Sequence, residues 1–351
     1  MTRLMDYAKY GCPKKEGDHY FHFFNSGLQP QSALYKQASL ADKPSLFFDP
    51  NCLSEDGTVS INTYSFSNTG KYFGYALSNS GSDWVNIHVM EVATKLPVGC
   101  VLEWAKFTGI QWMHDDSGFF YGRYPSPVLD TDKGTETQSN LDATVWFHSL
   151  KTTQQEDILV YKPEDPSHRA SAQVTDDGKY LLMGVSQSCD PKNLLFVYDL
   201  GLGIHKEMKF TTIVDVFKAS FEYISNEGPV FWFETTLNAP LKRIVKYDVS
   251  NTSVGFVEVI PESPHVVDFV TLFGSDKLVV VTLEDVKHVA KIYNIHSAKV
   301  VGTLPLPNGS IINSISAKRY RSFDLVSTMR CSIRTLRMQH LGKLCALTLQ
   351  I

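Results

Sequence analysis

The chain has 351 residues, a hydrophobic content of 43% and a formal net charge of −4. These values allow a large buried core, and no apolar run approaches the length of a membrane-spanning helix. The charge is uneven along the chain. Residues 1–317 carry 26 Lys and Arg against 36 Asp and Glu, whereas residues 318–351 carry seven basic residues against one acidic residue.

The start of the chain and its cysteines predict a cellular compartment. Residues 1–7 lack the apolar segment of a secretory signal. The six cysteines are scattered and none stands in a C-x-x-C pair, which argues against a zinc site and against a disulfide framework. We therefore expect a soluble protein of the reducing cytoplasm.

A short phrase recurs along the chain: polar turn residues, a glycine, then aromatic and β-branched residues. The glycines stand about 50 residues apart, which is typical of a β-propeller blade and longer than most helical repeats. A sixth copy at residues 274–279 is degenerate. The five clear copies are Lys14–Phe21, Ser67–Phe73, Asp115–Phe120, Asp176–Leu181 and Ser225–Phe231.

A second series of strands is predicted between these turns, because apolar and polar residues alternate there as in antiparallel hairpins. This gives about four strands per repeat and an all-β β-propeller. Six repeats are clear, and a seventh would need residues after about 300. A longer polar connection is expected at 125–140. The strands are predicted at 32–38, 84–92, 143–150, 193–200, 242–249 and 288–296.

The final stretch, residues 322–351, does not fit the repeat. It contains no glycine turn phrase, and its apolar residues are compatible with a weak helix or with ragged strands. The spacing of those residues does not decide between the two.

No self-contained catalytic site is visible in the sequence. The nearest approach to a G-x-S-x-G nucleophile motif, Gly184–Ser188, lacks the second glycine and follows a predicted strand without a helix. The pairs Asp115-Asp116 and Asp176-Asp177 precede repeat glycines, where Asp side chains cap turns. The histidines have no metal-ligand spacing and no phosphate-binding glycine loop is present, so we expect no metal and no cofactor.

Nucleic acid is not an expected partner. The acidic body of the chain has the wrong charge for a phosphate backbone, and a basic tail alone is more often a solvated segment. A membrane partner is not expected either, since no apolar segment is long enough.

Several weak motifs, taken together in their order and spacing, give the first 317 residues a resemblance to the propeller of the prolyl oligopeptidase family. This resemblance implies a seven-bladed β-propeller, here six clear blades and an incomplete or irregular seventh. The motifs are Asp49–Thr58, Tyr75–Ser78 with Ser80–Val85, Gly134–Thr137, Glu156–Leu159, Ser188–Pro191 and Asn226–Gly228.

In that family the propeller sits over an α/β-hydrolase domain, which bears the catalytic Ser, Asp and His, and admits only short peptides. The resemblance fails near Lys318, and residues 318–351 form an unmatched basic tail that completes or replaces the last blade. No triad residue can be assigned, so we expect a gating propeller for short proline-containing peptides that is inactive alone. A natural truncated product, a truncated paralogue and a gene-model fragment are all open.

A different class of function is also open: a non-catalytic propeller that binds a peptide or protein partner. An unfinished last blade would leave unpaired strand edges and an apolar face. Self-association through that blade is therefore an expectation of the sequence.

The resemblance assigns six residues to the substrate cleft. Phe107 matches an aromatic of the pocket for the third residue before the scissile bond, and Cys189 matches a thiol near it. Asp83 and Trp84 match a loop at the interdomain cleft. Two positions depart from the family: Arg169 stands where a methionine is common, and Ser186 where an arginine is common. If Arg169 faces the cleft, it favours an acidic residue at that third position.

Overall fold

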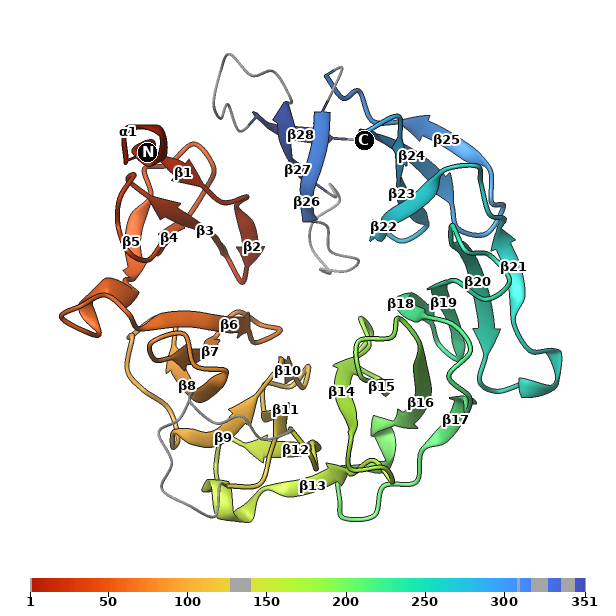
Figure 1. Cartoon of the computed structure of the whole chain (residues 1–351), viewed down its shortest axis with the longest axis horizontal. Coiled ribbons are helices and arrows are strands. Elements are labelled where there is room, and N and C mark those ends of the chain that lie inside the picture. The colour runs from red at the N-terminus through yellow and green to blue at the C-terminus, as the bar shows by residue number, and fades with distance from the viewer. Residues whose placement is uncertain (1, 127–139, 308–309, 317–327, 336–344, 351) are drawn as a thin grey trace. The chain divides into compact units, whose positions relative to one another are not determined.

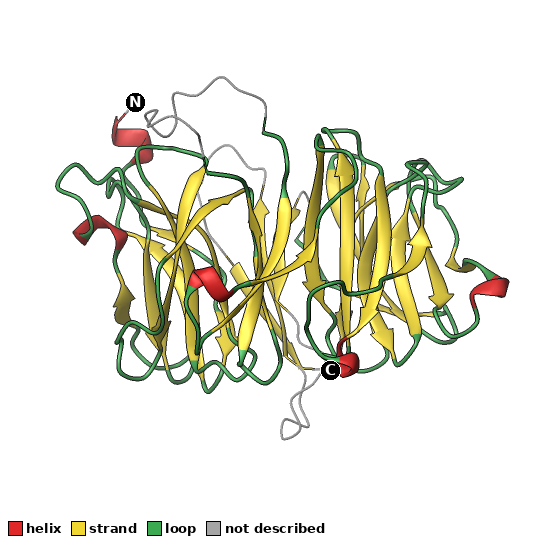
Figure 2. Cartoon of the chain, turned by 90° about the horizontal axis from the view of Figure 1, so that it is seen from below, coloured by secondary structure: helices red, strands yellow, loops and turns green. Residues whose placement is uncertain are grey.

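The computed structural model describes residues 2–126, 140–307, 310–316, 328–335 and 345–350 (Figure 1). Within these ranges the chain is built of strands. Figure 2 shows them in yellow, with only short helical turns in red. The helical turns are α1 (Thr2–Met5) and the 3-10 helices η1 (Pro50–Cys52), η2 (Gln154–Glu156), η3 (Leu200–Leu202) and η4 (Thr252–Val254). None of the described helices has the length and apolar character needed to cross a membrane.

The chain divides into two compact units. Unit 1 comprises Met1–Ala8 and Lys15–Phe217, and unit 2 comprises Lys9–Lys14 and Lys218–Ile351. Each unit consists of antiparallel sheets in which consecutive strands pair as hairpins.

Unit 1 contains four sheets, which we call blades 1 to 4 in chain order. Blade 1 contains β2 (Lys14–Glu16), β3 (His19–Asn25), β4 (Ala33–Gln37) and β5 (Ser45–Phe48); blade 2 contains β6 (Ser60–Phe66), β7 (Tyr72–Ser78), β8 (Trp84–Glu91) and β9 (Leu102–Lys106); blade 3 contains β10 (Ile110–Trp112), β11 (Gly118–Arg123), β12 (Thr144–Ser149) and β13 (Ile158–Tyr161); blade 4 contains β14 (His168–Val174), β15 (Tyr180–Gln187), β16 (Asn193–Asp199) and β17 (Thr211–Val214).

Unit 2 contains the short strand β1 (Lys9–Tyr10), blades 5 and 6, and a last sheet of three strands. Blade 5 contains β18 (Phe221–Glu227), β19 (Val230–Thr235), β20 (Arg243–Asp248) and β21 (Val257–Ile260); blade 6 contains β22 (Val266–Phe273), β23 (Lys277–Glu284), β24 (Lys287–Asn294) and β25 (Val300–Thr303); the last sheet contains β26 (Ser310–Ser316), β27 (Thr328–Thr335) and β28 (Cys345–Gln350).

The fold is an all-β β-propeller. The described residues form six blades, so the expectation of seven is wrong for them. The last sheet is not counted as a blade because it has three strands and lacks the fourth. The sequence supplies a reason, because residues after Ser316 carry no glycine turn phrase to begin another set of hairpins. The described parts of the tail, 328–335 and 345–350, are strands and not a helix.

The strands predicted between the glycine turns are confirmed, with ends that shift by one or two residues. They correspond to β4, β8, β12, β16, β20 and β24. The predicted polar connection at 125–140 and the motif Gly134–Thr137 fall on 127–139, which lies outside the described residues.

Strand β11 shows how the core of unit 1 is built. Successive side chains of a strand point to opposite faces of the sheet. Phe119 therefore packs toward blade 2, in a cluster with Ile87, and Phe120 packs toward blade 4, in a cluster with Leu181. Both phenylalanines are fully buried. A continuous apolar run in the sequence thus marks a strand that is covered on both faces.

The repeat glycines have the backbone conformation that the turns require. Gly17, Gly70, Gly178 and Gly228 have φ values of 59°, 78°, 70° and 54°, a region that other residues enter at a steric cost. In the third copy Asp116 takes the left-handed conformation instead, with φ 57°.

The glycine turns of adjacent blades also contact one another in unit 1. A Cβ atom on Gly70 would lie 2.4 Å from the backbone nitrogen of Gly17. Between blades 2 and 3, the hydroxyl of Thr69 donates to the carboxylate of Asp116. A Cβ atom on Gly178 would lie 2.5 Å from the ring of His114. The phrase that repeats in the sequence is therefore also the point where blades touch.

Replacing Gly70 with alanine is expected to destabilise unit 1 more than replacing Gly81. Both glycines are left-handed, with φ 78° and 75°, so each variant carries a backbone cost of about 1–2 kcal/mol. Gly81 has open space around its missing Cβ, whereas at Gly70 overlap with the neighbouring turn adds about 1–3 kcal/mol. Thermal unfolding of the two variants measures the difference, and equal decreases in Tm would contradict the turn contact.

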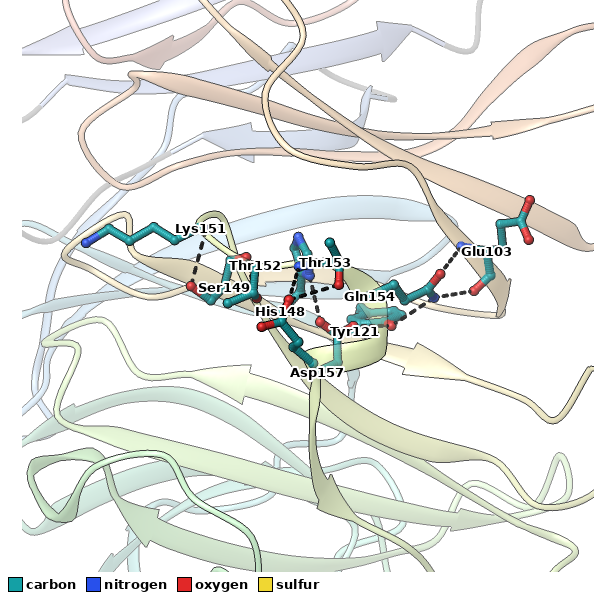
Figure 3. Close-up of polar contacts among 10 residues, drawn as sticks. Glu103, Tyr121, His148, Ser149, Lys151, Thr152, Thr153, Gln154 and Asp157 are labelled. Carbon is teal, nitrogen blue, oxygen red and sulfur yellow. Dashed lines mark hydrogen bonds and ion pairs between the residues drawn. The ribbon is translucent and has the colours of Figure 1, made fainter.

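A hydrogen-bond network with a buried centre at Asp157 ties blade 3 to β9 of blade 2 (Figure 3). Nδ1 of His148 lies 2.7 Å from Oδ1 of Asp157, and the hydroxyl of Tyr121 donates to Oδ2 of Asp157 at 2.7 Å. The amide of Gln154 donates to the Tyr121 hydroxyl at 3.2 Å and to the carbonyl of Glu103 at 2.9 Å. Burial, with the charge of Asp157, raises the pKa of Tyr121 above its usual range.

Asp157→Ala is expected to destabilise unit 1 by about 2–4 kcal/mol, because two buried polar groups, on Tyr121 and His148, lose their partner. The control is Asp115→Ala, since Asp115 is exposed and accepts its hydrogen bonds from the adjacent Ser117. For that variant the loss is expected to stay near 1 kcal/mol. Urea unfolding followed by tryptophan fluorescence measures both values, and a loss for Asp157→Ala no larger than the control would show that the network is dispensable.

Candidate functional site

A pocket of about 200 Å³ lies on blades 2, 3 and 4 of unit 1. Its described lining is cationic and aromatic, and the remaining residues are small or bear hydroxyls. The cations are Lys106, Arg123 and Arg169, the rings are Phe107 and Tyr124, and the others are Gly122, Ala143, Thr144, Ala170, Ser171 and Ser186. No carboxylate occurs among these residues.

Each of the three blades places one cation at the pocket from the end of a strand. Lys106 is the last residue of β9, and Arg123 is the last residue of β11. Arg169 is the second residue of β14, where it pairs in register with Ser186 of β15. The antiparallel ladders fix these positions, because the register determines which face a side chain takes.

Phe107 follows β9 directly and has an unusual conformation. Its φ is 50° and its side chain is 50% exposed. An aromatic residue is seldom found in the left-handed region, and a residue held there marks a site that the surrounding structure constrains. The ring meets that of Tyr124 edge to face, with 6.3 Å between centroids.

Two cations lie against the ring of Phe107. Nζ of Lys106 is 5.5 Å from the ring centroid, and Cζ of Arg169 is 5.6 Å from it. Lys106 is itself buried and also lies 4.9 Å from the ring of Trp84. Cation–π attraction of this kind contributes about 0.5–2 kcal/mol, depending on desolvation. The aromatic side chains thus help to hold two positive charges close together.

The two arginines of the pocket contact a carbonyl and a ring among the described residues. Arg169 donates from Nη2 to the carbonyl of Ser188 at 3.3 Å, and Cζ of Arg123 lies 5.2 Å from the ring of Trp146. Neither arginine takes part in an ion pair with another described residue. Burial raises the pKa of Tyr124, and the charge of Arg169 opposes that shift.

The six site residues predicted from the sequence fall into three groups. Phe107, Arg169 and Ser186 line the pocket. Trp84 does not line it but lies behind it, opposite Lys106 in register and 6.3 Å from Tyr124 between ring centroids.

Asp83 and Cys189 do not line the pocket. Asp83 is exposed next to the start of β8, and Cys189 is exposed beyond the end of β15, beside Ser188. Cys189 therefore adjoins the carbonyl that Arg169 contacts without facing the cavity. A role for the six residues in contacting substrate stays a prediction.

Sequence reasoning missed Lys106, Arg123 and Tyr124. Lys106 is adjacent to Phe107, which is the one signal that pointed to it. Arg123 and Tyr124 end a strand that reads as an ordinary apolar core strand, and no motif distinguishes them.

Comparison with known proteins agrees with this architecture. The family model for the prolyl oligopeptidase N-terminal β-propeller domain matches residues 1–326. Prolyl oligopeptidase A of Amanita bisporigera is 36% identical over 317 residues, which are 83% of this chain and 42% of that protein. The prolyl endopeptidase of Elizabethkingia meningoseptica is 32% identical over 310 residues, 87% of this chain and 42% of that protein.

A solved structure shows the same fold. Prolyl oligopeptidase B from Galerina marginata, bound to a 35mer hydrolysis and macrocyclization substrate, matches with a TM-score of 0.83 at 29% identity, over 93% of this chain and 47% of that chain. This chain spans less than half the length of these relatives, 42% for the two sequence matches. Because the family model covers most of the chain, the protein belongs to the prolyl oligopeptidase family and carries that family's N-terminal β-propeller.

Proposed function

We propose that this chain is the substrate-gating propeller of a prolyl oligopeptidase-type serine endopeptidase that acts on short proline-containing peptides. In this proposal an α/β-hydrolase domain supplies the nucleophile, the base and the oxyanion hole. The propeller limits access and holds part of the peptide. The similarity to prolyl oligopeptidases and to a prolyl endopeptidase supports the assignment.

The observation that carries the proposal is the pocket around Phe107. Phe107 is half exposed and held in a strained conformation, beside cations contributed by blades 2, 3 and 4. A mostly preformed cavity with a few oriented polar groups is the usual form of a ligand site. The related Galerina protein, an oligopeptidase, was solved bound to a 35mer hydrolysis and macrocyclization substrate, which supports a peptide as the ligand class here.

The chain alone is not expected to hydrolyse peptides. A serine nucleophile needs an adjacent base and donors for the oxyanion, and the sequence offers no G-x-S-x-G motif. Ser186, the nearest candidate, lies on β15 within a regular ladder opposite Arg169.

A second candidate function is peptide or protein binding without hydrolysis. The pocket favours it in one respect, since a cavity with three cations and two rings is formed by this chain's own blades. The two functions predict different results when the chain is joined to a hydrolase domain. Only the gating function predicts that the chain controls which substrates that domain cleaves.

We expect no turnover of a Gly-Pro reporter peptide and no labelling by a fluorophosphonate probe when the full chain is assayed by itself. In a chimera that replaces the propeller of the Amanita relative with this chain, we expect cleavage of short proline-containing peptides and rejection of a folded protein substrate. The control is the Amanita hydrolase portion without any propeller.

Labelling of Ser186 in the isolated chain would refute the assignment of catalysis to another domain. A chimera that cleaves the folded protein as readily as the control would refute gating. If the chain binds peptides but the chimera is stable and inactive, the second candidate, peptide or protein binding without hydrolysis, is favoured.

A further inference from the structure

Three cationic side chains line the pocket. Nζ of Lys106 and Cζ of Arg169 lie 5.5 and 5.6 Å from the centroid of the same ring, that of Phe107. Arg123 adds a third positive charge, and none of the described lining residues is acidic. This positive lining favours an anion as the ligand.

Both guanidinium groups line the pocket and can donate hydrogen bonds to an anion. Each lies near an aromatic ring, Arg169 by Phe107 and Arg123 by Trp146. A guanidinium carries five donors, and the one hydrogen bond described for Arg169 goes to the carbonyl of Ser188. The fork of guanidinium donors matches the two oxygens of a carboxylate.

The pocket also has an apolar surface and a neutral donor. The half-exposed ring of Phe107 can cover the methylene groups of a short side chain. Burial raises the pKa of Tyr124, so its hydroxyl is protonated at neutral pH and can donate a hydrogen bond. A lysine or arginine side chain in the same place would meet three like charges.

We propose that this pocket binds the carboxylate side chain of a peptide, with Arg169 and Arg123 as its donors and Phe107 as its apolar wall. The inference rests on the proposed function and narrows it, because it names acidic peptides as the favoured class. Glutamate suits the site better than aspartate, since its additional methylene extends the contact with Phe107. Inorganic phosphate has the same anionic oxygens but lacks the methylene groups and the peptide backbone.

The test uses the full chain and three matched peptides, acetyl-Glu-Ala-Pro-Gly-amide and its Gln and Lys counterparts. Dissociation constants come from NMR titrations of the peptide resonances at low and high salt. We expect the Glu peptide to bind about 10-fold more tightly than the Gln peptide, the ratio that one charge-assisted hydrogen bond supplies. The ratio should fall at high salt, and the Lys peptide should bind most weakly.

Arg169→Gln is expected to lower the Glu to Gln ratio to what Arg123 alone supports, while leaving the Gln peptide's dissociation constant unchanged. Arg169→Lys keeps the charge but not the fork, so an intermediate ratio is expected. Lys209→Gln is the control for net charge, because Lys209 is exposed and lies outside the pocket. An unchanged Tm for each variant confirms that the fold is intact.

Equal binding of the Glu and Gln peptides by the unaltered chain would overturn the inference. It would also be overturned if Arg169→Gln and the control Lys209→Gln changed the Glu to Gln affinity ratio by the same factor. Absence of binding by all three peptides would also overturn it. Inorganic phosphate is the competitor. If it displaces the Glu peptide and binds as tightly as that peptide does, the site does not select peptides and the assignment is wrong. These measurements need no hydrolase domain, so the inference and the proposed function are tested separately. The chain can lack a preference for the Glu peptide while the chimera cleaves short peptides, and it can show that preference while the chimera is inactive.

Discussion

The contact between the glycine turns of adjacent blades is the constraint on which unit 1 depends. At Gly70 the backbone of the preceding blade's turn, at Gly17, occupies the space that any side chain would need, and at Gly178 the ring of His114 does the same. Asp116 replaces this steric contact with a hydrogen bond from Thr69. Because the turns set how closely one sheet approaches the next, they also set which strand ends can share a pocket.

The candidate site follows from that stacking. Lys106, Arg123 and Arg169 come from three different blades and from strand ends that no short motif connects. The network around Asp157 reinforces the arrangement, because Gln154 bonds to both backbone groups of Glu103 within β9. The strand that carries Lys106 to the pocket is thereby held against blade 3.

Much of the fold was predictable from the sequence, because glycine turns and alternating strands are local signals. The strand β8 begins at the predicted residue, and the left-handed φ of Gly70 is what its place in the turn phrase requires. The number of blades was not predictable, since the seventh rested on family resemblance and the tail has no turn phrase. The position of Arg123 at the pocket was not predictable either, because proximity between blades is a tertiary property. Phe107 was found through resemblance, and neither its exposure nor its conformation could be inferred from periodicity.

Arg169 and Ser186 are the two positions at which the family resemblance predicts a departure. It implies a methionine at the first and an arginine at the second, which along the sequence counts as one cation gained and another lost. In the structure the two residues are direct cross-strand partners, and such partners have Cβ atoms about 5 Å apart. On that assignment, the guanidinium of Arg169 on β14 stands beside the position on β15 where the resemblance places an arginine, so the wall of the pocket keeps a positive charge.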